Sequence, residues 1–123
     1  MIQNEIIRCR KWIEDALEYS QGTHDFTDIV DGLLSGHMQL WPAENSCLVT
    51  EIVVYPKKKV LHVFLAGGNL DEILDMEQSL KEWGIMQGCS NMTMAGRKGW
   101  TKVLTKSGWQ PSFTVMSRGM TDE

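Results

Sequence analysis

The sequence predicts a single α/β domain spanning residues 1–123, in which helices cover one mixed sheet in the order ααβββαβαβ. Three observations support this fold class. Apolar segments with strand character alternate with helical segments between residues 60 and 116. Two of these strands flank a long helix, which indicates a crossover between parallel strands. The chain has 123 residues, is 42% hydrophobic and has no low-complexity run, so it can bury a core without disulfides.

The N-terminal part predicts two amphipathic helices. From Ile2 to Tyr19, apolar residues recur near the 3.6-residue period of a helix, and Gly22 follows as a stop. A second, shorter helix is expected from about Asp25 to Leu34, with Thr23 as its N-cap. Both helices therefore present one apolar face to the sheet.

Three strands are expected next, joined by short turns. Met38–Trp41 is a short strand, Cys47–Tyr55 is long and rich in β-branched residues, and Val60–Ala66 returns antiparallel to it. Because Cys47–Tyr55 is apolar at nearly every position, we expect it to be central and covered on both faces.

The longest predicted helix runs from Leu70 to Gln87. Asn69 and Glu72 have the spacing of a capping box at its start. Leu80 and Trp83 belong to its apolar stripe, so we expect both to lie on the buried face.

The C-terminal third predicts strand, helix and strand. Asn91–Ala95 is expected to lie parallel to Val60–Ala66 and next to it. A short helix follows Gly96 and ends at Ser107–Gly108, and the last strand is expected at about Ser112–Met116.

Several protein classes are excluded by composition. The apolar runs are too short to span a bilayer, and charges throughout the first fifteen residues argue against a secretion signal. The three cysteines are widely spaced, with no C-x-x-C pair, so neither a zinc site nor a disulfide framework is indicated. We therefore expect a protein that is not secreted and makes no membrane contact.

Charge is divided unevenly along the chain. The net charge is −4, yet residues 83–121 contain no acid and five bases. Two interpretations remain open. Opposite charges can face each other across the fold, or the basic part can form a face for an anionic partner.

The element order resembles that of the GNAT superfamily, the acetyl-CoA-dependent N-acetyltransferases. At motif level, GRKGWTKVLTKSGW at residues 96–109 is similar to the GNAT helix that ends in a Gly-Phe pair, with Gly108 and Trp109 at the paired positions. HMQLWP, TEIVVYP, VLHVFLAGG and AGRKGW also resemble small GNAT-like proteins encoded among the virion genes of tailed bacteriophages. The resemblance implies a GNAT fold and a link to phage particles.

The resemblance also places the cofactor loop, which in GNAT enzymes holds a pyrophosphate between a strand and the long helix. Gly67, Gly68 and Asn69 are the candidate cofactor-binding residues here. This loop is short, lacks the usual Arg or Gln, and leads into Asp71 and Glu72, whose charges oppose phosphate. The segment is therefore expected to be a capped helix start.

Few residues of this sequence match the catalytic residues of GNAT enzymes. Many GNAT enzymes use a tyrosine four residues before the Gly-Phe glycine to protonate the leaving thiolate, and Leu104 occupies that position. Glu51 and His62 are the candidate bases near the presumed cleft. His24 and His37 form no metal-ligand spacing, so no metal site is expected.

Basic and aromatic residues follow the predicted strand Asn91–Ala95. We consider them a candidate contact for a partner or an anion, because cations beside glycines at a helix start can bind anions and because Arg and Trp dominate interfaces. The candidates are Arg97, Lys98, Trp100, Lys102 and Trp109. The alternative is a tight turn with solvated bases.

Three functions are compatible with these features. The preferred hypothesis is a non-catalytic GNAT-fold phage protein that needs no cofactor and contacts other virion proteins or itself, in the virion or in the cytoplasm of an infected bacterium. The first alternative is an acetyl-CoA-dependent N-acyltransferase with a divergent cofactor loop. The second is a nucleic-acid-associated module that uses the basic C-terminal third, for which a further signature is missing.

Overall fold

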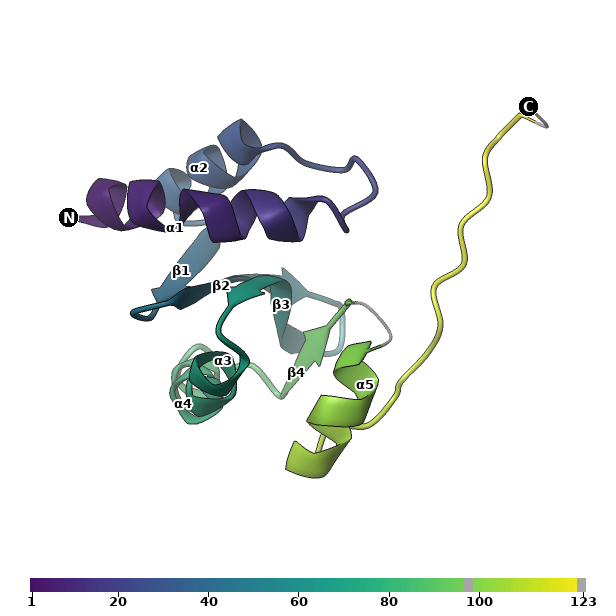
Figure 1. The fold of residues 1–123 in the computed structure, drawn as a ribbon. Helices are drawn as coiled ribbons and strands as arrows, with labels where there is room; N and C mark the ends of the chain where they lie inside the picture. Colours follow the sequence, from purple (N-terminus) through teal and green to yellow (C-terminus); the bar gives the residue numbers. More distant parts are fainter. Residues whose placement is uncertain (97–98, 122–123) are drawn as a thin grey trace.

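The computed structural model describes residues 1–96 and 99–121 and has a mixed sheet between two layers of helices (Figure 1). The sheet order is β1-β2-β3-β4, with bounds Met38–Pro42, Ser46–Val54, Lys59–Gly68 and Asn91–Met94. β1, β2 and β3 pair antiparallel, and β3 and β4 pair parallel. The predicted parallel relationship is therefore confirmed.

Two helices cover one face of the sheet (Figure 1). They are α1 (Ile2–Leu17) and α2 (Phe26–Ser35). Ile6, Cys9 and Ile13 from α1 pack with residues of β2 and β3 in a first core. The N-cap of α2 is Asp25, which forms a capping box with Asp28, so the prediction of Thr23 as the cap is wrong.

The opposite face is covered by α3 (Leu70–Asp75) and α4 (Glu77–Met86). A second core lies on this face of the sheet. Leu80 is buried in it, and the half-buried Trp83 packs against it, so both residues lie on the buried side of the helix, as predicted. The single long helix predicted here divides at Met76. Ile73, Met76 and Leu80 all pack in the second core, so the break at Met76 lets both helices keep their apolar side toward the sheet.

The central strand β2 is buried from both sides. Cys47 and Val49 belong to the first core, whereas Leu48 belongs to the second. Its pairing with β3 contains a β-bulge: Val49 is opposite Leu65 and Thr50 is opposite Val63, which leaves Phe64 as an extra residue of β3.

The chain ends in α5 (Gly99–Leu104), a 3-10 turn η1 (Thr105–Ser107) and an extended tail. The strand predicted at Ser112–Met116 does not form: residues 110–121 are exposed and carry no strand in this structure. The tail leads away from the domain (Figure 1). It makes too few contacts with the domain to fix a strand register.

Candidate functional site

The pairing between β3 and β4 stops before β3 ends. Their pairing runs from Val60 with Asn91 to Val63 with Met94. β3 then continues to Gly68, whereas β4 stops at Met94. The last five residues of β3 therefore have no strand beside them on this side within the described part of the chain.

A groove lies along this stretch, and we call it the strand-gap groove. Its volume is about 490 Å³. Its walls come from the end of β3, from α3 and from α5, and they consist of Ala66, Gly67, Gly68, Leu70, Ile73, Gly99, Trp100 and Val103. None of the described side chains that line it is charged, so these walls suit an extended, mainly apolar ligand that could also bond to the exposed backbone of β3.

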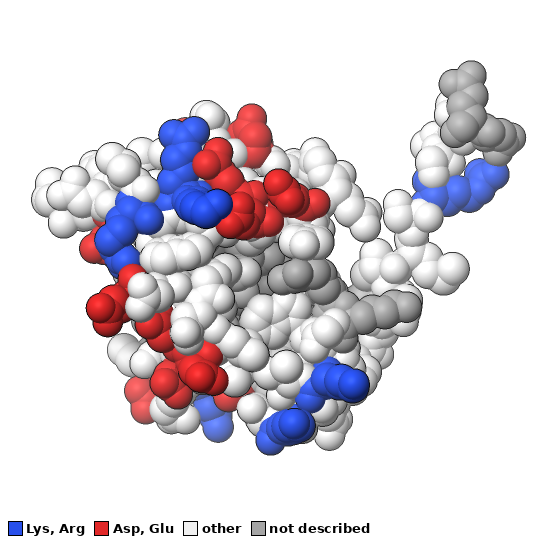
Figure 2. All heavy atoms as spheres, viewed as in Figure 1, with Lys and Arg blue, Asp and Glu red and all other residues white. Residues whose placement is uncertain are grey.

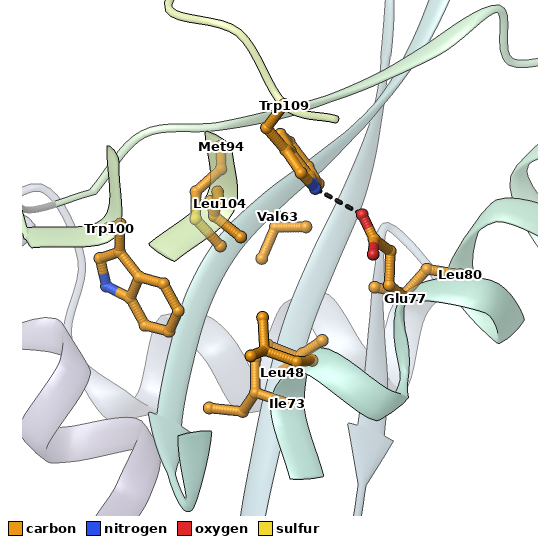
Figure 3. A pocket seen from close by; sticks show the side chains of 10 residues that line it. Leu48, Val63, Ile73, Glu77, Leu80, Met94, Trp100, Leu104 and Trp109 are labelled. Carbon is orange, nitrogen blue, oxygen red and sulfur yellow. Dashed lines mark hydrogen bonds between the residues drawn. The ribbon is translucent and has the colours of Figure 1, made fainter. Parts of the chain in front are cut away.

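A much smaller cavity shares Ile73 and Trp100 with the groove (Figure 3). Its volume is about 20 Å³, and Val63, Leu104 and Trp109 are among its lining residues. An apolar space of this size is a gap in the second core.

The two candidate glycines of the cofactor loop are required by packing. A Cβ atom on Gly67 would lie 2.6 Å from the carbonyl oxygen of Trp12 in α1. Gly68 has a φ of +104°, and a Cβ there would collide with the carbonyl of Asn45. Both glycines also line the strand-gap groove. Because neither has a side chain, this part of the groove wall consists of backbone.

Asn69 acts as a helix cap. Its side-chain oxygen accepts a hydrogen bond from the Glu72 amide at 3.0 Å, as the sequence predicts. The second half of the predicted capping box is wrong, because the Glu72 carboxylate turns to the β1–β2 connection. There it accepts from the Ser46 hydroxyl at 2.7 Å and the Asn45 amide at 2.9 Å.

The start of α3 is unfavourable for a phosphate. The hydrogen bonds from Ser46 and Asn45 lower the pKa of Glu72, so its carboxylate stays ionised at neutral pH. Asp71 adds a second acid in the same turn. The side chain of Asn69 is already engaged, and the described residues that line the groove include no Lys or Arg.

Glu51 and His62 are directly opposite each other on β2 and β3. Burial is the main reason that the pKa of His62 lies below its ordinary value, and the Glu51 charge partly offsets it. The Nδ1 atom of His62 is 2.8 Å from the hydroxyl of Thr93 on β4. This imidazole is therefore neutral at pH 7 and held in place.

His62 lies next to the point where the strands part. Val63, the following residue, is the last β3 residue paired with β4. Leu61 and Val63 belong to the second core, so His62 faces the α1–α2 side. The structure thus brings Glu51, His62 and Thr93 together across three strands. Thr93 was missed because nothing in the sequence indicates the register of β4.

Three residues of the predicted partner contact lie in the described part of the chain, namely Trp100, Lys102 and Trp109. Trp100 and Trp109 point into the second core, and the Trp109 indole donates to the Glu77 carboxylate (Figure 3). Lys102 is exposed on α5. Arg97 and Lys98 lie outside the described residues.

Surface charge follows the division seen in the sequence only in part. In Figure 2, acidic side chains gather around α3 and α4, acidic and basic side chains lie together over α1, and further basic side chains lie at α5 and on the tail. Among the described residues, no group of three or more His, Cys, Asp or Glu could hold a metal ion. No described helix is long and apolar enough to cross a bilayer.

Comparison with known proteins identifies the fold. No protein-family model matches the sequence, and no curated protein does either. Among solved structures, an acetyltransferase of Trypanosoma brucei superposes with a TM-score of 0.60 and 11% identity over 78% of both chains. A protein described as a probable acetyltransferase gives 0.60 and 12%, over 80% of this chain and 78% of the other.

A third similar structure is a tetramutant of the BH1408 protein from Bacillus halodurans, with a TM-score of 0.60 and 8% identity over 81% of this chain and 77% of that one. Two of these three neighbours are described as acetyltransferases. The chain therefore has the GNAT fold, as its element order predicts.

Proposed function

We propose that this protein is an acyl-CoA-dependent N-acyltransferase whose cofactor site is divergent. The observation that supports this most is the strand-gap groove, which opens where a GNAT-type sheet would receive the pantetheine arm of coenzyme A. Its apolar walls and unpaired β3 backbone fit such an arm, which alternates short alkyl units with amides. The labels of the structural neighbours favour the same function.

The groove fits only part of the cofactor. Trp100 and Val103 on α5 and Leu70 on α3 would hold the pantetheine arm. Asp71 and Glu72 would repel the pyrophosphate at the start of α3. We therefore expect the arm to supply most of the affinity.

The groups near the strand gap have definite roles in this proposal. When bound, acyl-CoA would supply an activated acyl group as a thioester. His62 faces the α1–α2 side, so through Nε2 it would take a proton from an acceptor amine that approaches the strand gap from that side, provided that Nδ1 donates to Thr93. Glu51 would stabilise the imidazolium that results. Leu104 offers no proton to a leaving thiolate, so turnover should be slow.

Binding of the arm can be tested by calorimetry with acetyl-CoA and with acetyl-pantetheine, which lacks the phosphates. We expect both to bind with dissociation constants within about tenfold of each other, a difference of about 1.4 kcal/mol. Val103→Trp should fill the groove and abolish binding of both. Thr101→Trp, on the exposed side of α5, is the matched control and should bind normally. If neither compound binds the unaltered protein, the acyltransferase proposal is rejected.

A second candidate is a non-catalytic protein that acts by contact with other proteins, such as those of a phage particle. Leu104 and the acids at the start of α3 favour it, because they remove a proton donor and oppose phosphate. If neither acetyl-CoA nor acetyl-pantetheine binds in the calorimetry, the acyltransferase is rejected and the non-catalytic protein remains as the candidate. Co-purification with particles that survives nuclease treatment would then support protein contact over a nucleic-acid role for the basic α5 surface.

A further inference from the structure

The small cavity in the second core adjoins the strand-gap groove. Ile73 and Trp100 line both spaces, so these two side chains form a wall that the cavity and the groove share. Val63 and Met94 also line the cavity, and they are the last pair of residues at which β3 and β4 are joined (Figure 3). The cavity therefore lies where the two strands begin to separate.

The cavity is small and mainly apolar. Its volume of about 20 Å³ is slightly more than one water molecule needs, so it has room for about one methyl group. Leu48, Val63 and Leu80 in its wall are buried. Glu77 also lines it, and the carboxylate of Glu77 accepts a hydrogen bond from the Trp109 indole. An apolar group that entered such a space would gain contacts without displacing a bound water.

The positions proposed for the two reactants give the direction of an acyl chain. The pantetheine arm would lie along the end of β3, with its thioester near the point where β3 and β4 join. The acceptor amine would approach from the α1–α2 side, because His62 faces that side. The acyl chain is then directed to the opposite face of the sheet, where Val63 and Met94 border the cavity.

We propose that this cavity selects the acyl group, so that the site takes propionyl-CoA in preference to acetyl-CoA. The cavity can have this role only if the acyltransferase function proposed above holds. The methyl of an acetyl group would end beside Ile73 and Trp100, and the additional carbon of a propionyl group would pass between them into the cavity. A butyryl group is longer than the cavity allows, so its end would press on Leu104 or Trp109.

Calorimetry with acetyl-CoA, propionyl-CoA and butyryl-CoA tests the selection, with free CoA as the reference. We expect propionyl-CoA to bind about fourfold more tightly than acetyl-CoA, which is the usual gain for one buried methylene group. Butyryl-CoA should bind no more tightly than propionyl-CoA. If none of the four compounds binds, the acyltransferase function and the selection are both wrong. If all four bind equally, or if butyryl-CoA binds most tightly, only the selection by the cavity is wrong.

Two variants change the cavity in opposite directions, at positions that are not among the described residues lining the groove. Val63→Ile adds one methyl group to the cavity wall and should remove the preference for propionyl-CoA. Leu104→Ala enlarges the cavity, so butyryl-CoA should become the tightest ligand. Val60→Ile is the matched control, because it adds the same methyl group to a buried valine of β3 that does not line the cavity. This control should keep the preference for propionyl-CoA.

Thermal unfolding shows whether each variant is folded at the temperature of the calorimetry. If Val63→Ile does not fold, Leu104→Ala still decides, because Leu104 is only half-buried. An unchanged order of the three acyl-CoA ligands in Leu104→Ala would overturn the proposal. Equal effects of Val60→Ile and Val63→Ile on that order would also overturn it, since selection would then not depend on the cavity.

Discussion

The Trp109 indole donates a hydrogen bond to the Glu77 carboxylate, which lies 32 positions earlier in the sequence. This contact joins the end of η1 to the first turn of α4. Within the described part of the chain, this side-chain hydrogen bond ties the α5–η1 segment to the layer of helices below the sheet. Because α5 forms one wall of the strand-gap groove, the contact also helps to fix the shape of the groove.

Trp109→Phe should remove this bond while keeping an aromatic ring in place. We expect the free energy of unfolding to fall by about 1 kcal/mol, the usual net value of one hydrogen bond. Glu77→Gln should cost less, since its amide oxygen can still accept. A double-mutant cycle of Trp109→Phe and Glu77→Ala in chemical denaturation should show non-additivity, and additive losses would mean that the bond contributes nothing.

Leu80→Ala should be strongly destabilising. Leu80 is 3% exposed in the second core, so its truncation removes buried surface and leaves a cavity, at a cost of about 2–5 kcal/mol. Ile85 lies on the same helix but is 63% exposed, and Ile85→Ala should change stability by less than about 0.5 kcal/mol. Similar losses for the two variants in urea unfolding would show that α4 presents a different face.

Glu72→Gln should weaken the fold at neutral pH and less so in acid. The folded-state pKa of Glu72 is lowered, so its carboxylate stabilises the fold fully above the ordinary value of 4.5. That stabilisation is lost as the pH falls through the lower folded value. Thermal unfolding of both proteins should therefore converge at low pH.

His62 should titrate below its ordinary pKa of 6.5 in an NMR experiment. Because burial disfavours the charged ring, the unfolded chain binds a proton more readily, and stability falls as the pH drops below about 6.5. Glu51→Gln should lower the pKa of His62 further, since the Glu51 charge opposes the effect of burial. An increase in the His62 pKa in that variant would contradict the pairing of the two residues.

Much of the fold could be predicted because its signals are local. The period of apolar residues locates α1 and α4, and the long helix between Val60–Ala66 and Asn91–Ala95 indicates that these strands are parallel. The strand at Ser112–Met116 was predicted on the same kind of pattern and does not form, because a strand also needs a partner that a local pattern cannot supply.

The candidate site was less predictable, because it depends on register. Glu51 and His62 were each suggested by residue type, but their direct opposition follows from the β2–β3 pairing. Thr93 joins them only through the β3–β4 register. The strand-gap groove depends on where β4 stops, and a four-residue strand gives little indication of its end in sequence.

The bulge at Phe64 has a consequence for insertions and deletions. One extra residue reverses the phase of β3, so Leu65 turns to the first core and the small Ala66 turns to the groove side. Deleting Phe64 would join Val63 directly to Leu65, and these two residues already face opposite sides and pair with the neighbouring residues Thr50 and Val49. Leu65, Ala66 and Gly67 would therefore keep their faces. Loss of Ala66, which follows the bulge, would instead turn Gly67 to the groove side and away from Trp12. The bulge is therefore the place in β3 where the chain should best tolerate the loss of one residue.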